Sequence, residues 1–132
     1  MHLEQYGGGQ VYFSPVDVIF SSFDVVEPDL LFVSDARQEI LTDTWVYGSP
    51  DLVVEILSPS TRRRDEGIKL RLYERFNVFE YWIVDPKAEA FRIYRRRDRQ
   101  LEQVVELTRS RDEAVTTPLL PGLSLPLAKV FT

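Results

Sequence analysis

The sequence predicts a mixed α/β (α+β) domain in which short strands come first, followed by one well-marked helix and then further strands. Residues 52–57 are all apolar apart from Glu55, which is typical of a strand covered on both faces. A helical pattern over about residues 62–75 follows, and a second run that is apolar apart from Glu80, 78–84, comes directly after it. We therefore expect a mixed central β-sheet with the helix packed on it and a C-terminal β-hairpin.

Composition narrows the class of protein. A chain of 132 residues with 44% hydrophobic residues is long enough and apolar enough for a single folded domain, 1–132. No apolar run approaches the roughly 18 residues of a membrane span, and the N-terminus has no signal pattern, so we expect a cytoplasmic protein with no membrane contact. Because the chain has no cysteine and one histidine, any metal would be held by oxygen, which favours Mg²⁺, Mn²⁺ or Ca²⁺.

The N-terminal third predicts short strands. Residues 7–9 form a glycine run that predicts a flexible lead-in, and strand segments are expected at 10–13 and 16–20. Residues 25–33 predict a longer strand with Pro28 inside it. Proline cannot donate to a strand ladder, so this strand should lie at an edge or bulge at that point.

The spacing of apolar and charged residues predicts the end of the helix, its apolar stripe and the C-terminal hairpin. Asn77 suits the end of the helix, and segments 90–94 and 103–107 should pair as a hairpin around the charged residues 95–99. The Pro/Leu-rich tail from residue 117 onward is expected to pack over the core as extended chain. The expected apolar stripe of the helix, at i, i+4 and i+8, is Ile68, Leu72 and Phe76.

The net charge of −5 does not itself indicate nucleic-acid binding, yet the arginines concentrate in the second half of the chain. They include two triplets, at 62–64 and 95–97. Arginine makes bidentate contacts with phosphate, so such triplets could hold a nucleic-acid backbone, whereas solvated helix and hairpin faces explain the charge equally well. The candidate nucleic-acid contacts are Arg62, Arg63 and Arg64.

Two acids interrupt apolar strands. An ionised Glu55 is costly to bury without a partner or a metal, and Asp29 poses the same problem in the preceding strand. If the two strands are neighbours, Asp29 and Glu55 approach each other on one face, where a divalent cation would offset their repulsion. Lys69 lies four residues after Asp65 and four before Tyr73, so these three share a helix face.

Each of these residues, taken alone, also has a simpler interpretation. Asp29 beside Pro28 could be a turn acid, Lys69 with Asp65 could be an ordinary surface pair, and Tyr73 could be a core aromatic. For Glu55 the functional interpretation is the stronger one even in isolation. A lysine aimed at a two-carboxylate metal site could position a water or stabilise the charge that develops on a phosphate.

Four blocks follow one another along the chain: Pro28-Asp29, the run EILSPST at 55–61, the trio Asp65, Lys69 and Tyr73, and EYWIVDP at 80–86. Together they resemble the Uma-type endonuclease family, a branch of the PD-(D/E)XK restriction-endonuclease-like nucleases. The resemblance covers the chain from about Val16 to the tail, and it implies a restriction-endonuclease-like core and a Mg²⁺- or Mn²⁺-dependent endonuclease that hydrolyses DNA.

The resemblance carries the site over residue by residue. Asp29 matches the aspartate of the Pro-Asp strand and Glu55 the first acid of the (D/E)XK strand, and these two would hold the metal. The third motif position is Leu57, so the catalytic lysine resembles one relocated to the helix, Lys69. Asp65 and Tyr73 would support that lysine. Asp51 also follows a proline, but it lies about 13 Å from Glu55 along the strand and is the second choice.

The chain departs from the family pattern at its start. Family members usually carry an N-terminal helical segment that supplies a further glutamate and covers the sheet, whereas only residues 1–9, with Glu4 as the one acid, precede the first expected strand. A bare sheet face predicts a homodimer formed through exposed apolar surface. It also leaves open a second hypothesis, a catalytically inactive nuclease-fold protein with a structural or DNA-binding role.

Overall fold

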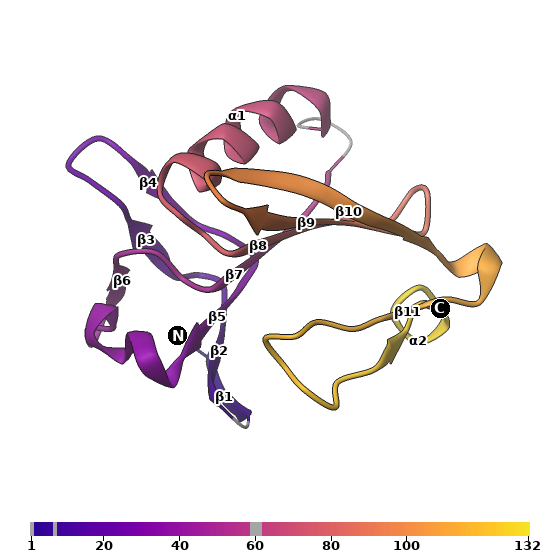
Figure 1. Cartoon of the computed structure of the whole chain (residues 1–132), viewed down its shortest axis with the longest axis horizontal. Coiled ribbons are helices and arrows are strands. Elements are labelled where there is room, and N and C mark those ends of the chain that lie inside the picture. Colours follow the sequence, from indigo (N-terminus) through magenta and orange to yellow (C-terminus); the bar gives the residue numbers. More distant parts are fainter. Residues whose placement is uncertain (1, 7, 59–61) are drawn as a thin grey trace.

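A seven-stranded mixed sheet forms the centre of the molecule, in the order β1-β2-β5-β7-β8-β9-β10 (Figure 1). The computed structural model describes residues 2–6, 8–58 and 62–132, with side chains described for 8–58 and 66–132. The β7–β8 pair is parallel and the other neighbouring pairs are antiparallel. The strands are β1 (His2–Tyr6), β2 (Gly9–Phe13), β5 (Leu30–Ser34), β7 (Leu52–Ile56), β8 (Glu80–Asp85), β9 (Ala90–Arg97) and β10 (Gln100–Thr108).

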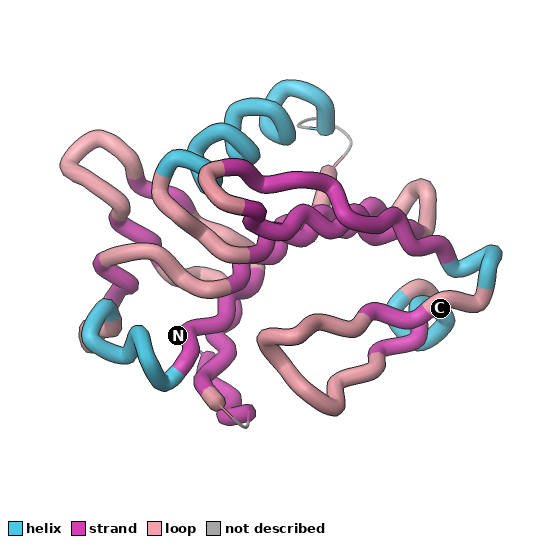
Figure 2. Tube along the Cα trace, in the orientation of Figure 1, coloured by secondary structure: helices cyan, strands magenta, loops and turns pink. Residues whose placement is uncertain are grey.

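Different elements cover the two faces of this sheet (Figure 2). Helix α1 (Arg62–Arg75) lies on one face, and the C-terminal segment lies on the other. A small second sheet consists of β3 (Asp17–Ile19), β4 (Val25–Val26) and β6 (Trp45–Tyr47). The C-terminal segment contains β11 (Ala114–Val115), β12 (Leu125–Pro126) and the short helix α2 (Leu127–Val130). Two 3₁₀ helices, η1 (Asp35–Ile40) and η2 (Arg109–Arg111), complete the set.

The central strands β7 and β8 are buried on both faces, as their continuous apolar runs predict. Val54 and Trp82 pack toward the C-terminal segment, in a cluster that includes Leu127. Val53 and Ile83, which alternate with them, pack on the α1 side. The helix between the two parallel strands supplies the crossover that such a pair needs.

Helix α1 has the predicted bounds, but its predicted apolar stripe is only partly buried. Leu72 and Phe76 are half-buried, with Phe76 stacked on Phe20, whereas Ile68 is 52% exposed. Tyr73 is instead fully buried, and Leu70 packs against the same cluster. Polar contacts to the sheet set the rotation of the helix, because Lys69 and Tyr73 both reach a carboxylate on β7. The helix stops as predicted at Asn77, which adopts a left-handed conformation.

Gly67 offers a direct test of helix stability. It lies inside α1, and a Cβ there would meet only the side chain of Arg71, at ordinary van der Waals distance. We expect Gly67→Ala to raise the free energy of unfolding by about 0.5–1 kcal/mol, because alanine loses less backbone entropy on entering a helix. Urea unfolding followed by circular dichroism measures this change. A destabilised variant would indicate that the helix backbone needs glycine at this point.

The second arginine triplet mainly has structural contacts. Arg95 pairs with Glu80 on β8. Arg96 donates from Nε to the carbonyl of Val78 and from Nη2 to carbonyls at the C-terminal end of α1, so it satisfies backbone acceptors that the helix leaves open. Arg97 is 81% exposed. Of this triplet, therefore, Arg97 presents its charge most fully to solvent.

The structure corrects three predictions in the N-terminal third. Residues 2–6 form β1, an edge strand that pairs with β2, although the sequence predicts that the first strand starts at residue 10. Part of the predicted glycine lead-in, Gly9, is packed in β2 so closely against Val33 and Phe32 that a Cβ would clash; Gly7 lies outside the described residues. The predicted strand 25–33 is two strands, because Pro28 separates β4 from β5 and the two belong to different sheets.

The C-terminal hairpin is confirmed and is longer than predicted, since β9 and β10 pair from Ala90 to Thr108 with an irregularity between Gln103 and Val105. The tail packs on the core as predicted, through Val115, Leu120 and Leu127. It is less extended than expected, because it contains the β11–β12 pair and the short helix α2. Among the described residues, no helix combines the length and the apolar character that a membrane crossing requires.

Candidate active site around Glu55

Strands β5 and β7 bring the two predicted acids together. They pair antiparallel with Leu30 opposite Val54, so Asp29, one residue before Leu30, lies beside the end of β7 that carries Glu55. Asp29 Oδ2 accepts a hydrogen bond from the backbone N–H of Ile56 at 2.7 Å. Because β5 begins only after Pro28, the aspartate side chain is available at the strand end for this contact.

Helix α1 supplies two further groups to Glu55. The Tyr73 hydroxyl donates to Glu55 Oε2 at 2.7 Å, and Lys69 Nζ lies 2.9 Å from the same oxygen. Lys69 and Tyr73 are four residues apart and therefore face the sheet together, as the sequence predicts. The side chain of Asp65, predicted on the same face, lies outside the described part of the chain.

Burial dominates the electrostatics of Glu55, whose side chain is only 7% exposed. Desolvation raises the pKa of this carboxyl, the hydrogen bonds from Lys69 and Tyr73 lower it in part, and the charge of Asp29 raises it again. Burial, and then the charge of Glu55, hold the pKa of Tyr73 well above its usual value. Tyr73 therefore stays protonated and serves as a hydrogen-bond donor.

The two acids form a donor set that fits Mg²⁺. This ion is commonly held by one or two carboxylates, with water and substrate phosphate oxygens completing its shell. No group of three or more histidine, cysteine, aspartate or glutamate side chains suited to a metal occurs among the described residues. A second positive charge beside Glu55 and Asp29 would offset both their mutual repulsion and the cost of burial.

The other predicted site residues lie elsewhere or are not described. Asp51 precedes β7, where Oδ2 accepts from the Ser34 N–H at 2.6 Å and Oδ1 lies 3.5 Å from Arg37 Nε. These contacts anchor the connection between β5 and β7 at the opposite end of the strand from Glu55. The backbone of Arg62, Arg63 and Arg64 begins α1, while their side chains are outside the described set.

A further charged group, not singled out in the sequence, contacts the helix that carries Lys69. Arg92 on β9 forms an ion pair with Glu66 on α1, and its Nη1 lies 3.7 Å from Asp85 Oδ2. The sequence signal is weak, because an arginine between Phe91 and Ile93 is also typical of a strand with one solvated face. Only the tertiary fold shows that this face is the one that α1 covers.

Comparisons with known proteins place the chain by family and by fold. The model of the Uma2 family, described as "Putative restriction endonuclease", matches residues 1–128. A solved structure from Anabaena variabilis ATCC 29413, described as a putative nuclease belonging to DUF820, superposes with a TM-score of 0.73 at 18% identity, over 93% of this chain and 68% of that one. A search of curated proteins finds no match. At this identity the solved structure establishes a shared fold.

Proposed function

Since the chain belongs to the Uma2 family of "Putative restriction endonuclease" proteins, we propose that it hydrolyses phosphodiester bonds in DNA with the help of Mg²⁺ or Mn²⁺. One observation carries the proposal: a buried carboxylate, Glu55, lies beside Asp29 on the next strand and within ion-pair distance of Lys69. Buried acids next to a lysine, in a nuclease fold, are the groups that metal-assisted phosphate hydrolysis requires.

Each residue has a distinct role in this proposal. Asp29 and Glu55 hold the cation, which when bound polarises a phosphate oxygen and makes a bound water more acidic. Lys69, a cation on a rigid helix, orients the attacking water or stabilises the charge that develops on the phosphate. Tyr73 fixes the Glu55 carboxylate by donating to Oε2, so that the carboxylate does not need to reorganise during the reaction.

DNA is the substrate that the family description suggests, and Arg62, Arg63 and Arg64 at the start of α1 are the proposed backbone contacts. The proposal includes a cytoplasmic location and a homodimer. Exposed apolar side chains on the small sheet and the loop beside it, among them Phe23, Trp45 and Tyr47, provide surface for such an association. Light scattering on the purified protein measures the oligomeric state.

Lys69→Met tests the chemistry. We expect purified wild-type protein to nick supercoiled plasmid in the presence of Mn²⁺, and Lys69→Met to lower the rate about 10²- to 10³-fold while Mn²⁺ still binds. Methionine keeps much of the length and the apolar stem of lysine but removes its charge. Gel quantification of nicked and linear forms measures the rate, and Lys87→Met, at an exposed turn position, is the matched control. Equal rates for Lys69→Met and Lys87→Met would remove Lys69 from the mechanism.

The second hypothesis, a catalytically inactive nuclease-fold protein, predicts a different result. A nuclease-fold protein with a structural or DNA-binding role would leave every plasmid form intact. Calorimetric titration with Mn²⁺ would then show no binding that depends on Asp29 and Glu55. Asp29→Asn is the informative variant for this titration, because it removes the charge and keeps an acceptor for the Ile56 N–H.

A further inference from the structure

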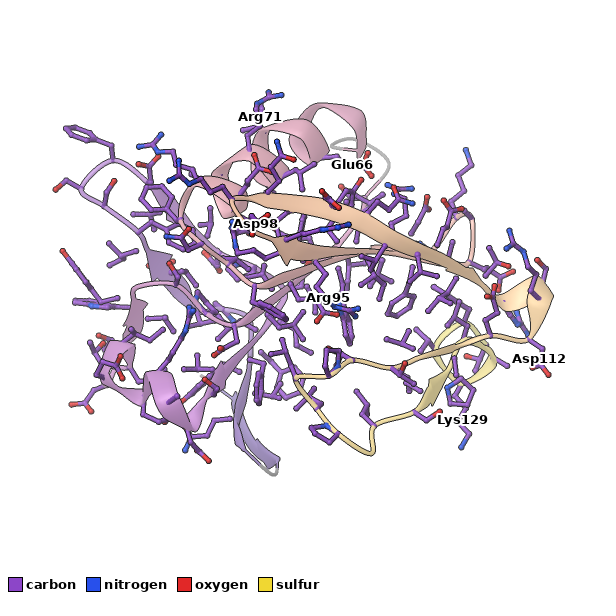
Figure 3. The ribbon with its side chains drawn as sticks, viewed as in Figure 1. Glu66, Arg71, Arg95, Asp98, Asp112 and Lys129 are labelled. Atoms are coloured by element: carbon purple, nitrogen blue, oxygen red, sulfur yellow. The ribbon has the colours of Figure 1, made fainter. Side chains whose placement is uncertain are left out.

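Three polar contacts fasten the sheet-facing side of α1 to the sheet. Two of them, from Lys69 and Tyr73, meet at Glu55 in the proposed site. The third is the ion pair between Glu66 and Arg92, one turn before Lys69. Figure 3 shows Glu66 on the N-terminal half of the helix and Arg71 on the outward side, away from the sheet. Because Glu66 and Lys69 are three residues apart, they lie on the same helix face.

Strand register places Arg92 on the same sheet face as Glu55. Glu55 on β7 is opposite Ile83 on β8, and Ile83 is opposite Arg92 on β9. Residues that are paired across neighbouring strands point to the same face, and two strand spacings amount to about 10 Å. Arg92 and Glu55 thus provide two fixed points on the sheet, and α1 contacts both.

Apolar packing near Lys69 cannot replace the contact between Glu66 and Arg92. Gly67 has no side chain, Ile68 is exposed, and the buried apolar contacts of the helix begin at Leu70 and continue at Tyr73. Among the described side chains of α1 that precede Lys69, Glu66 is the one that pairs with a residue of the sheet, Arg92. Asp85, almost completely buried, lies close enough to orient the Arg92 guanidinium.

We propose that Arg92 is a positioning residue for the reaction: through its ion pair with Glu66 it sets the rotation and the height of α1, and thereby the place of the Lys69 ammonium. The inference rests on the proposed function, in which Lys69 acts on the phosphate or the attacking water. A small displacement of such a group lowers the rate strongly without weakening the binding of metal or DNA. In this proposal Arg92 acts through Glu66 and α1 and does not itself bind the metal or the DNA.

The test compares Arg92→Ala, Glu66→Gln and the double variant. We expect each single variant to lower kcat for plasmid nicking about 10- to 100-fold per folded molecule, with KM for DNA and Mn²⁺ affinity unchanged within about threefold. The double variant should have a kcat no lower than that of the slower single variant, because both substitutions break the same contact. Arg92→Lys, which keeps the charge, should recover part of the rate.

A second readout does not depend on cleavage. In the wild-type protein the Lys69 ammonium, held by Glu55, should give a resolved proton–nitrogen NMR signal, assigned by its loss in Lys69→Met. Arg92→Ala and Glu66→Gln should broaden or shift this signal. Arg95→Ala is the control, because Arg95 lies on the same strand but pairs with Glu80 on the opposite face of the sheet, so the Lys69 signal should persist.

Two outcomes would overturn the proposal, and a third would overturn the proposed function. An unchanged Lys69 signal together with an unchanged kcat in Arg92→Ala overturns the proposal. A raised KM for DNA in Arg92→Ala but not in Glu66→Gln also overturns it, because Arg92 would then bind the substrate directly. If the wild-type protein cleaves nothing, the proposed function fails, and the NMR signal alone then tests whether Arg92 positions Lys69.

Discussion

Replacing Glu55 by glutamine is expected to abolish metal-dependent cleavage, with a loss of about a thousandfold or more, while the protein stays folded. The amide keeps the shape of the side chain and an oxygen that can accept from Tyr73. It cannot supply the negative charge that the cation requires. Mn²⁺ should raise the melting temperature of the wild-type protein and leave that of Glu55→Gln unchanged, because a ligand stabilises only the state that binds it.

The stability of Glu55→Gln relative to wild type should also change with pH, and the direction of this change can be derived. Burial raises the pKa of Glu55 in the folded protein above its unfolded value, so the folded state binds the proton more tightly. The stability that this proton contributes is present at low pH and is lost as the pH rises from the ordinary glutamate pKa through the raised one. Glu55→Gln lacks this loss, so its stability relative to wild type should increase across that window and then level off.

Urea unfolding from pH 4 to pH 8, without metal, measures the difference between the two proteins. Glu27→Gln serves as the control, because Glu27 is an exposed acid two residues before Asp29. Its free energy of unfolding should stay within about 0.5 kcal/mol of the wild-type value. A stability difference that does not change with pH for Glu55→Gln, or full cleavage by that variant, would remove Glu55 from the centre of the site.

Replacing Glu80 by alanine is expected to lower the free energy of unfolding by about 3 kcal/mol. This carboxylate is completely buried and joins three elements: it accepts from Trp82 Nε1 at 2.8 Å and from Thr117 Oγ1 at 2.7 Å, and it pairs with Arg95 at 3.2 Å. Figure 3 shows Arg95 between the sheet and the C-terminal segment. Removing the carboxylate leaves a cation and two donors without their acceptor.

Chemical denaturation of Glu80→Ala measures the loss, and Glu102→Ala is the matched control. Glu102 faces Arg97 at 4.0 Å on the exposed hairpin, where an ion pair contributes little, so this change should stay within about 0.5 kcal/mol. The cleavage rate per folded molecule should be the same in both variants, since Glu80 lies on the sheet face opposite Glu55. A loss below about 1 kcal/mol for Glu80→Ala would contradict the view that this network fastens the C-terminal segment.

The unit β7–α1–β8 could be predicted from the sequence because each of its parts is strongly marked. A continuous apolar run, a helix and a second apolar run lie close together, and the position of Lys69 relative to Tyr73 follows from helix geometry alone. The meeting of Asp29 and Glu55 required one further assumption, that their strands are neighbours, and the β5–β7 pairing confirms it.

Other features could not be read from local patterns. Ile68 fits an apolar stripe, yet the helix turns its polar side chains inward because the sheet offers a carboxylate and an arginine as partners. Strand β1 has little β-branched or alternating character and depends on its pairing with β2. The role of Glu80 likewise depends on Thr117, a residue far along the chain, so only the tertiary structure could show it.

The pairing of Glu55 with Lys69 and Tyr73 also bears on how the protein folds. All three come from one strand and the helix that follows it, so their contacts close a short loop and can form early. Asp29 joins only when β5 docks along β7, a step that pairs more distant parts of the chain. We therefore expect a metal ion held by the two acids to act on the docking of β5 against β7, where they meet, and not on the formation of α1.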